Sequence, residues 1–311
     1  MDTHEVYTHS GKLGTGLFVI PLVGIPAALA LALIYAYIDV YSPIAGVISI
    51  LFVIGFAVAL GMTLRVVGAF AKVRSAPFMT AAGILCGLVG LYAAWAGFEA
   101  ALLSKAAKAG EETPGFLELL AAPGAVWELA KLINHHGWYS IKSATPTGGV
   151  LWVMWAIEAA IVVVGVAIMA PSGVVDEVFC ERCDRWAALA GGPARLGLPE
   201  DDATIETLAL GGPEAVDALE ALPSVGEAAV RLEVELRRCD ACAETATYQV
   251  KLARQTVDDK GNVGTERKDL TPKYLAPPDA FSRLAALAGR PPTSAPPAGE
   301  APPEDAGDAG A

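Results

Sequence analysis

The stretch VRLEVELRRCDACAETATYQVKL, residues 230–252, decides the fold of the C-terminal half of this chain. Before its two cysteines apolar residues alternate with charged ones, and after them apolar residues alternate with polar ones. This period-two alternation is typical of two half-buried strands. The pattern therefore predicts an antiparallel hairpin that carries Cys239 and Cys242 at its tip.

A second Cys-x-x-Cys pair, Cys180 and Cys183, follows an extended-looking segment at residues 174–179. Four thiols in two such pairs form a tetrahedral site for one metal ion, most often a structural zinc ion. The candidate ligands of one zinc ion are therefore Cys180, Cys183, Cys239 and Cys242. Two alternatives stay open from the residues alone, an iron–sulfur cluster and a redox-active pair of dithiols.

A Cys-x-x-Cys pair at a hairpin tip, together with a second such pair, resembles the zinc-ribbon family. The resemblance covers residues 174–271 and implies four thiolates on one zinc ion, backed by a small antiparallel sheet. The 55 residues between the pairs, 184–238, exceed the usual zinc-ribbon spacing and are interpreted as an insertion. In the insertion we expect a strand at 204–210 and a helix at 213–222.

The hairpin is followed by further signals of the same sheet. Residues 258–262, with the sequence DDKGN, are typical of a turn. We expect a third strand after this turn, at residues 263–270. The C-terminal half is therefore predicted to be a small α+β domain with an antiparallel sheet.

Four apolar runs in the first half are long enough to cross a bilayer, which takes about 20 residues of helix. Hydrophobic residues make up 54% of the chain and its mean hydropathy is +0.46, values that fit a protein with a large membrane part. The first run is too long for the core of a signal peptide, so we expect it to remain as a membrane helix. The four-helix transmembrane bundle is expected at residues 17–38, 44–67, 78–103 and 149–170.

The segment between the third and fourth runs, residues 104–148, contains two amphipathic patterns separated by Pro123 and Gly124. They predict two short helices within residues 114–134 that lie along the membrane face. Three aromatic residues there have rings that favour the headgroup level: Trp127, Trp138 and Tyr139.

Charge is unevenly distributed along the chain. Residues 1–170 carry nine acidic and eight basic side chains, whereas residues 171–311 carry 25 and 14, so −11 of the net charge of −12 lies in the second part. Nucleic-acid binding requires a basic surface, which such a half does not provide. We therefore expect no nucleic-acid partner, although many zinc ribbons bind nucleic acid.

The distribution of Lys and Arg predicts the orientation in the membrane. Basic residues between the second and third helices, and just after the fourth, favour the cytoplasm for both termini: Arg65, Lys72, Arg74, Arg182 and Arg185. The outer loop carries basic residues that oppose this orientation: Lys105, Lys108, Lys131 and Lys142. We predict a multi-pass protein of a bacterial inner membrane. Nine residues, 171–179, reach at most about 30 Å, so the metal site is expected just under the membrane.

Two acidic residues lie within the predicted membrane helices, Glu99 in the third and Glu158 near the middle of the fourth. A charge at such a depth is costly, so it faces the bundle interior and marks either a hydrogen-bonded contact or a proton or ion site. Gly83 and Gly87 have the spacing that lets helices approach closely, within the bundle or across a dimer. Cys86 is interpreted as a small packing residue.

These observations divide the chain into a membrane domain at residues 1–170, a cytoplasmic four-cysteine domain at 171–289 and a disordered acidic tail at 290–311. No catalytic motif is present, so we name no catalytic residue and favour a non-enzymatic role. The leading interpretation is a protein of the lipid bilayer whose membrane-proximal structural zinc domain acts as a scaffold that holds the bundle together or binds a protein partner. No oligomeric state is predicted. The alternatives are a small transporter that uses Glu158 and Glu99, and a membrane thiol–disulfide oxidoreductase.

Overall fold

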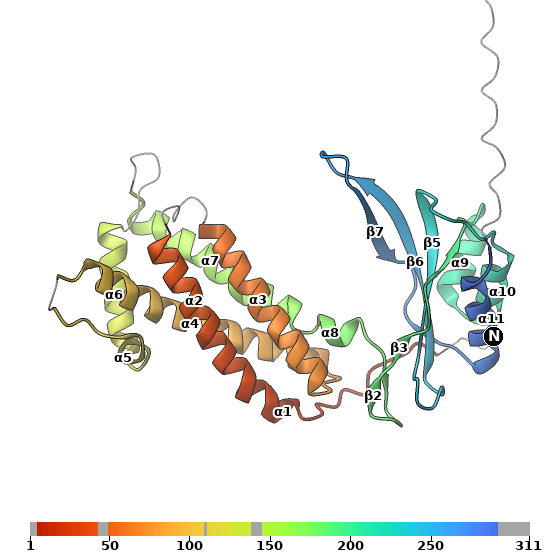
Figure 1. Cartoon of the computed structure of the whole chain (residues 1–311), viewed down its shortest axis with the longest axis horizontal. Helices are drawn as coiled ribbons and strands as arrows, with labels where there is room; N and C mark the ends of the chain where they lie inside the picture. The colour runs from red at the N-terminus through yellow and green to blue at the C-terminus, as the bar shows by residue number, and fades with distance from the viewer. Residues whose placement is uncertain (1–4, 43–48, 109–110, 138–144, 292–311) are drawn as a thin grey trace, which may run out of the picture. The chain divides into compact units, whose positions relative to one another are not determined.

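The computed structural model describes residues 5–42, 49–108, 111–137 and 145–291. Contacts divide the chain into two compact units. One unit spans residues 9–177 and is helical. The other joins residues 1–8 to residues 178–311 and contains the sheet (Figure 1). The predicted tail at 290–311 lies almost entirely outside the described residues.

Four helices of the first unit are long and apolar enough to cross a membrane. The first begins with α1 (Gly16–Val19), passes through the π-helical turn η1 (Ile20–Gly24) and continues as α2 (Ile25–Tyr41). The other three are α3 (Ser49–Phe70), α4 (Ala76–Ala106) and α7 (Gly148–Met169). Each of the four predicted runs thus contains a helix, although residues 44–48 of the second run lie outside the described residues.

Small residues let these helices pack closely. A Cβ atom added at Gly83 of α4 would lie 2.9 Å from the carbonyl oxygen of Val166 and 3.1 Å from the Cα atom of Ala167, both on α7. A Cβ atom at Gly87 would lie 3.3 Å from the Cα atom of Val163. The glycine spacing in α4 therefore serves a close contact within this bundle. Cys86 is buried in the same core.

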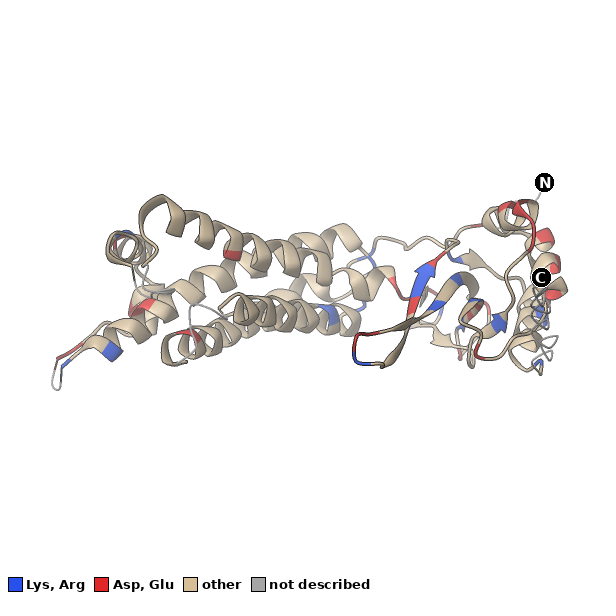
Figure 2. Cartoon of the chain, turned by 90° about the horizontal axis from the view of Figure 1, so that it is seen from above, with Lys and Arg blue, Asp and Glu red and all other residues tan. Residues whose placement is uncertain are grey.

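Large apolar side chains cover much of the outside of the helices. Phe18, Leu22, Val66 and Phe70 are each more than 60% exposed. Charged side chains are sparse along this unit and frequent on the other one (Figure 2). An apolar exterior of this kind suits contact with lipid, since a soluble bundle would direct such side chains inward.

Two short helices follow α4, as the amphipathic patterns predicted. They are α5 (Phe116–Leu120) and α6 (Pro123–His136), and the break between them falls before Pro123. The Tyr92 hydroxyl of α4 donates a hydrogen bond of 2.8 Å to the carbonyl oxygen of Leu120, which anchors α5 to the bundle. Trp127 of α6 packs against Trp152 of α7, with ring centroids 5.3 Å apart and the rings tilted by 37°. Trp138 and Tyr139 lie outside the described residues.

The second unit is built on an antiparallel sheet. Its central strands β5 (Val230–Arg238) and β6 (Ala246–Val257) form the predicted hairpin, and β7 (Val263–Asp269) is the predicted third strand. Three short strands complete the main sheet: β3 (Ala188–Leu189) and β4 (Ala194–Leu196) pair with β5, and β8 (Tyr274–Leu275) pairs with β6. A separate two-stranded sheet is formed by β1 (Phe179–Cys180) and β2 (Arg185–Trp186).

Three helices pack on one side of this sheet: α9 (Asp202–Leu210), α10 (Pro213–Ala221) and α11 (Pro278–Ala288) (Figure 1). The core between the two layers holds Leu219, Leu284 and Leu287 from the helices against Leu232 and Tyr248 from the strands. The alternation in β5 and β6 therefore directs its apolar residues onto the helices.

The structure corrects two predictions in this half. Residues 204–210 form the helix α9 instead of a strand, because Asp201 caps the helix: its carboxylate accepts a hydrogen bond of 2.7 Å from the Thr204 amide. Residues 174–179 are not extended throughout, since the short helix α8 (Ser172–Val175) occupies their start and the strand begins at Phe179. The helix at 213–222 is confirmed as α10. The sequence reasoning missed α11.

The N-terminal segment is also part of the sheet unit, which the sequence did not predict. Val6 bridges Tyr274 of β8. The Tyr7 amide donates a hydrogen bond of 2.8 Å to the Lys273 carbonyl oxygen, and the Leu275 amide donates one of 2.9 Å to the carbonyl oxygen of Glu5. The first described residues of the chain thus add a short extended segment beside β8.

Candidate metal centre

Each of the two Cys-x-x-Cys pairs lies at the turn of an antiparallel hairpin. The first pair begins in β1, where Cys180 is the register partner of Arg185 in β2. The second pair lies in the connection from β5 to β6, whose last register pair joins Arg238 to Ala246. The predicted position of Cys239 and Cys242 at a hairpin tip is therefore confirmed.

The two turns share a backbone feature. The residue directly after the second cysteine has a positive φ in both, 50° at Asp184 and 58° at Ala243. The second turn is closed by backbone hydrogen bonds, from the Ala243 amide to the Cys239 carbonyl oxygen and from the Cys239 amide to the Thr245 carbonyl oxygen. A left-handed residue at the same place bends each chain sharply, so that both sulfur atoms of a pair face the same side.

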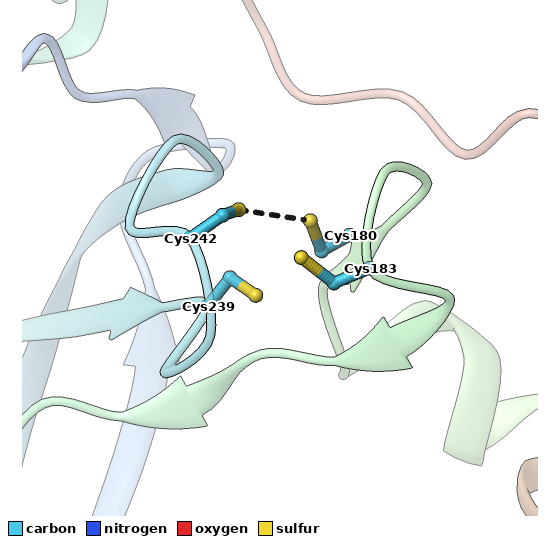
Figure 3. Close-up of side chains that lie close together, drawn as sticks. All are labelled: Cys180, Cys183, Cys239 and Cys242. Atoms are coloured by element: carbon cyan, nitrogen blue, oxygen red, sulfur yellow. Dashed lines mark hydrogen bonds between the residues drawn. The ribbon is translucent and has the colours of Figure 1, made fainter.

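The four sulfur atoms converge on one point (Figure 3). All four lie within 4.8 Å of one another, and the Sγ atoms of Cys180 and Cys242 are 3.6 Å apart. A tetrahedral zinc ion with Zn–S bonds of about 2.3 Å would separate its sulfur ligands by about 3.8 Å. A disulfide would need about 2.05 Å, and none of the five cysteines forms one. The residues therefore fit one tetrahedral metal ion.

Burial and charge around the sulfur atoms also suit a metal ion. Cys180 and Cys239 are fully buried, whereas Cys183 and Cys242 are half-buried, so one side of the site faces solvent. Hydrogen bonding with Cys183 lowers the pKa of the Cys242 thiol, and the same contact raises the pKa of Cys183 to about 12. Thiolates this close together repel one another, so a bound cation would stabilise them.

Two arginines lie next to the cluster. Arg185 pairs with Asp240 at 3.2 Å, and Arg182 pairs with Glu244. Each pair joins one cysteine turn to the other, since the arginines belong to the first turn and the acids to the second. Hydrogen bonding to Asp240 raises the pKa of Arg185, which keeps a fixed positive charge beside the sulfur atoms.

Residues behind the first turn fix its position. Phe179 packs edge-on against Trp186 with ring centroids 5.0 Å apart. The Tyr7 hydroxyl accepts a hydrogen bond of 2.8 Å from the Phe179 amide. The N-terminal segment therefore supports the residue directly before Cys180. The polar N-terminus carries no sequence signal for this role.

The two acids predicted within membrane helices are not brought together. Glu158 of α7 lines a cavity with Asp39 and Tyr35 of α2, whereas Glu99 of α4 is buried outside it. The first apolar run predicts a helix that ends at residue 38, but α2 continues to Tyr41 and buries Asp39. The signal that could have found Asp39 is its place directly after the apolar run, within one turn of its end.

Comparison of the chain with protein-family models, with curated proteins and with solved structures found no match. The cysteine geometry is therefore the principal guide to function. Among the described residues, these four cysteines are the one group that could hold a metal ion through His, Cys, Asp or Glu ligands.

Proposed function

We propose that this chain is a multi-pass membrane protein whose C-terminal unit folds around one structural zinc ion and serves as a docking platform for a protein partner. The convergence of Cys180, Cys183, Cys239 and Cys242 carries this proposal. Four protein thiolates fill a tetrahedral zinc ion completely and leave no position for water or substrate, which is the mark of a structural site rather than a catalytic one. The paired cysteine turns are the feature shared with the zinc-ribbon family.

The zinc ion would contribute stability at the β1–β2 hairpin, which is too small to bury a core of its own. The β1–β2 hairpin contains two residues per strand and pairs with no other strand in the described part of the chain. Bonds from a metal ion to both turns would attach it to the β5–β6 hairpin. Binding free energy of this kind is folding free energy, because the unfolded chain holds no preformed site.

The proposed location is the cytoplasmic side of a bacterial inner membrane. Four crossings return the chain to the side on which it began, and the bridge between Val6 and Tyr274 requires the same, because the N-terminal segment pairs with the C-terminal sheet. Arg65, Lys72 and Arg74, at the end of α3 and before α4, favour the cytoplasm for that side.

The edge strand β7 is the surface that best suits a protein partner. It ends the strand order of the main sheet, so its outer edge can accept another strand. The hairpin tip beside it exposes Val257 and Val263 to 68% and 67%. Backbone groups of the edge would supply affinity, and the two exposed valines would supply apolar contact.

The test is a comparison of two cysteine variants of the full chain in detergent. Cys239→Ser removes one ligand, whereas Cys86→Ser alters a buried cysteine far along the chain from the cluster. We expect Cys239→Ser to make the C-terminal unit protease-sensitive while the protein stays in the membrane fraction, and Cys86→Ser to leave the C-terminal unit resistant. A Cys239→Ser protein that keeps both one equivalent of metal and normal protease resistance would overturn the proposal.

A further inference from the structure

A small cavity lies inside the helical unit, and all four long helices contribute to it. Its volume is about 60 Å³. The oxygen-bearing side chains in its wall come from α2, α3 and α7: Tyr35, Asp39, Ser49 and Glu158. This cavity is separate from the cysteine cluster, and its chemistry does not depend on zinc.

Asp39 is the decisive residue of this cavity. Asp39 is only 5% exposed. Its Oδ1 atom is buried and has no hydrogen-bond partner in the described part of the chain. Glu158 lines the same cavity, and no lysine, arginine or histidine stands among the described lining residues. Two carboxyl groups inside an apolar bundle stay ionised only where a positive charge compensates them, and are protonated otherwise.

Aromatic rings form a large part of the remaining cavity wall, together with aliphatic side chains. Tyr35 stacks on Phe56 with ring centroids 5.5 Å apart, and Trp95 lies edge-on to Trp155 at 4.6 Å. The faces of such rings attract cations, and ammonium groups with alkyl substituents are the ligands that aromatic cages hold best. Calcium takes six to eight oxygen ligands. The four oxygen-bearing side chains carry six side-chain oxygens, two on each carboxyl group and one on each hydroxyl, so calcium would have to engage all of them. A monoalkylammonium ion has only three N–H donors to satisfy.

We infer that this cavity binds a small alkylammonium ion of the size of methylammonium. The carboxylates of Asp39 and Glu158 would neutralise the charge, and Trp95, Trp155 and Tyr35 would contact the alkyl group and the cation. The volume sets the size limit: 60 Å³ is less than half of the about 150 Å³ that an apolar cavity uses to hold benzene. Tetramethylammonium is therefore too large.

The experiment is a fluorescence titration of the full chain in detergent at fixed pH and ionic strength, because Trp95 and Trp155 line the cavity. Methylammonium chloride should cause a saturable change in tryptophan emission. Tetramethylammonium, sodium and potassium chlorides should not. An equal saturable change with sodium or potassium, or no saturable change with methylammonium, would overturn the inference.

Variants locate the binding. Asp39→Asn and Glu158→Gln should each abolish the saturable change, and Trp155→Phe should weaken binding by about two- to fivefold. Glu99→Gln is the matched control, since it neutralises a buried carboxyl that does not line the cavity. Trp155→Phe keeps both carboxyls and tests the site even if an acid variant fails to fold. Unchanged binding in the folded Asp39 or Glu158 variant, or an equal loss in Glu99→Gln, would contradict the assignment.

Discussion

At the scale of single residues, the two cysteine turns depend on a conformation that most residues avoid. Ala243 has a φ of 58°, a left-handed value that costs a non-glycine residue about 1–2 kcal/mol. The second turn keeps this conformation because it brings Cys239 and Cys242 to the same point as the first pair. The strain is thus a consequence of where the sulfur atoms must lie.

Replacing Ala243 with glycine should therefore stabilise the C-terminal unit. Glycine adopts the left-handed region without a steric penalty, although it loses more entropy on folding, so we expect a net gain of about 0.5–1 kcal/mol. This gain is measured by unfolding the full chain in urea and monitoring how well the amides of the β5–β6 hairpin are protected from hydrogen exchange. Ala253→Gly is the control, because it places glycine within β6, where stability should fall instead.

A buried ion pair makes the same unit sensitive to acid. The Glu233 carboxylate is 3% exposed and accepts hydrogen bonds from Arg231 at 2.8 Å and from Arg267 at 2.7 Å. Burial alone would raise the pKa of Glu233, but the hydrogen bonds from Arg267 and Arg231 outweigh it and lower the pKa. A lowered folded-state pKa contributes stability above the unfolded value, and this contribution is lost as the pH falls through the folded-state pKa.

We therefore expect the urea concentration at the unfolding midpoint of the C-terminal unit to decrease as the pH is lowered beyond about 4.3, the ordinary pKa of Glu. Glu233→Gln should reduce this acid-side dependence and should cost about 3–5 kcal/mol at neutral pH, because it leaves buried Arg231 without a carboxylate. Glu206→Gln, at an exposed position on α9, is the control. An acid-side profile of Glu233→Gln identical to that of the unmodified chain would contradict this account.

At the scale of elements, sequence patterns predicted what depends on local periodicity. The long apolar runs and the alternation around Cys239 led directly to the four long helices and the β5–β6 hairpin. The strand predicted at 204–210 failed because Thr204, Ile205 and Thr207 favour strands, whereas the Asp201 cap favours a helix, and the cap prevailed. The spacing of the cysteines suggested that the two pairs share one site. Only the folded chain shows that their sulfur atoms converge, because 55 residues separate the pairs.

Other features had a weak local signal or none. Pairing of Val6 with Tyr274 joins segments from opposite ends of the chain. The burial of Asp39 depends on the packing of α2 against its neighbours. Neither follows from the composition of the segments involved, since a short polar N-terminus and an acid at the end of an apolar run are ordinary in isolation.

The contact between α4 and α7 gives a prediction for the helical unit. A methyl group at Gly83 would meet the Val166 carbonyl oxygen at 2.9 Å, so the backbones would have to separate. Gly83→Ala should therefore lower the melting temperature of the detergent-solubilised protein. Gly55→Ala in α3 is the matched control, because an added methyl group there meets no atom within 4 Å. Equal stability of the two variants would indicate that α4 and α7 do not pack this closely.

At the scale of the whole molecule, the sheet unit combines segments from both ends of the chain. If the long helices cross a membrane, the strand bridge at Val6 places the N-terminal segment and the C-terminal sheet on the same side of it. The four membrane-length helices among the described residues agree, because an even number of crossings returns the chain to the side on which it began.

Tags at the two ends should therefore behave alike. We expect both to be protected from protease in spheroplasts, whose outer membrane is opened, and both to become accessible in inverted membrane vesicles, as the basic residues before α4 favour. A membrane-anchored periplasmic marker protein, degraded in the first preparation and protected in the second, controls for sidedness. Tags found on opposite sides would contradict both the strand bridge and the four crossings.

Metal analysis of the purified full chain, with thiols counted before and after chelation, tests the zinc centre most directly. The account predicts one zinc ion per chain and no disulfide in the untreated protein. It also predicts four thiols that react with an alkylating reagent only after the metal has been removed by chelation. Loss of the metal should expose Cys180, Cys183, Cys239 and Cys242 to alkylation together, since in this account all four hold the same ion. Iron with acid-labile sulfide, or a disulfide between any two of these cysteines with no bound metal, would contradict it.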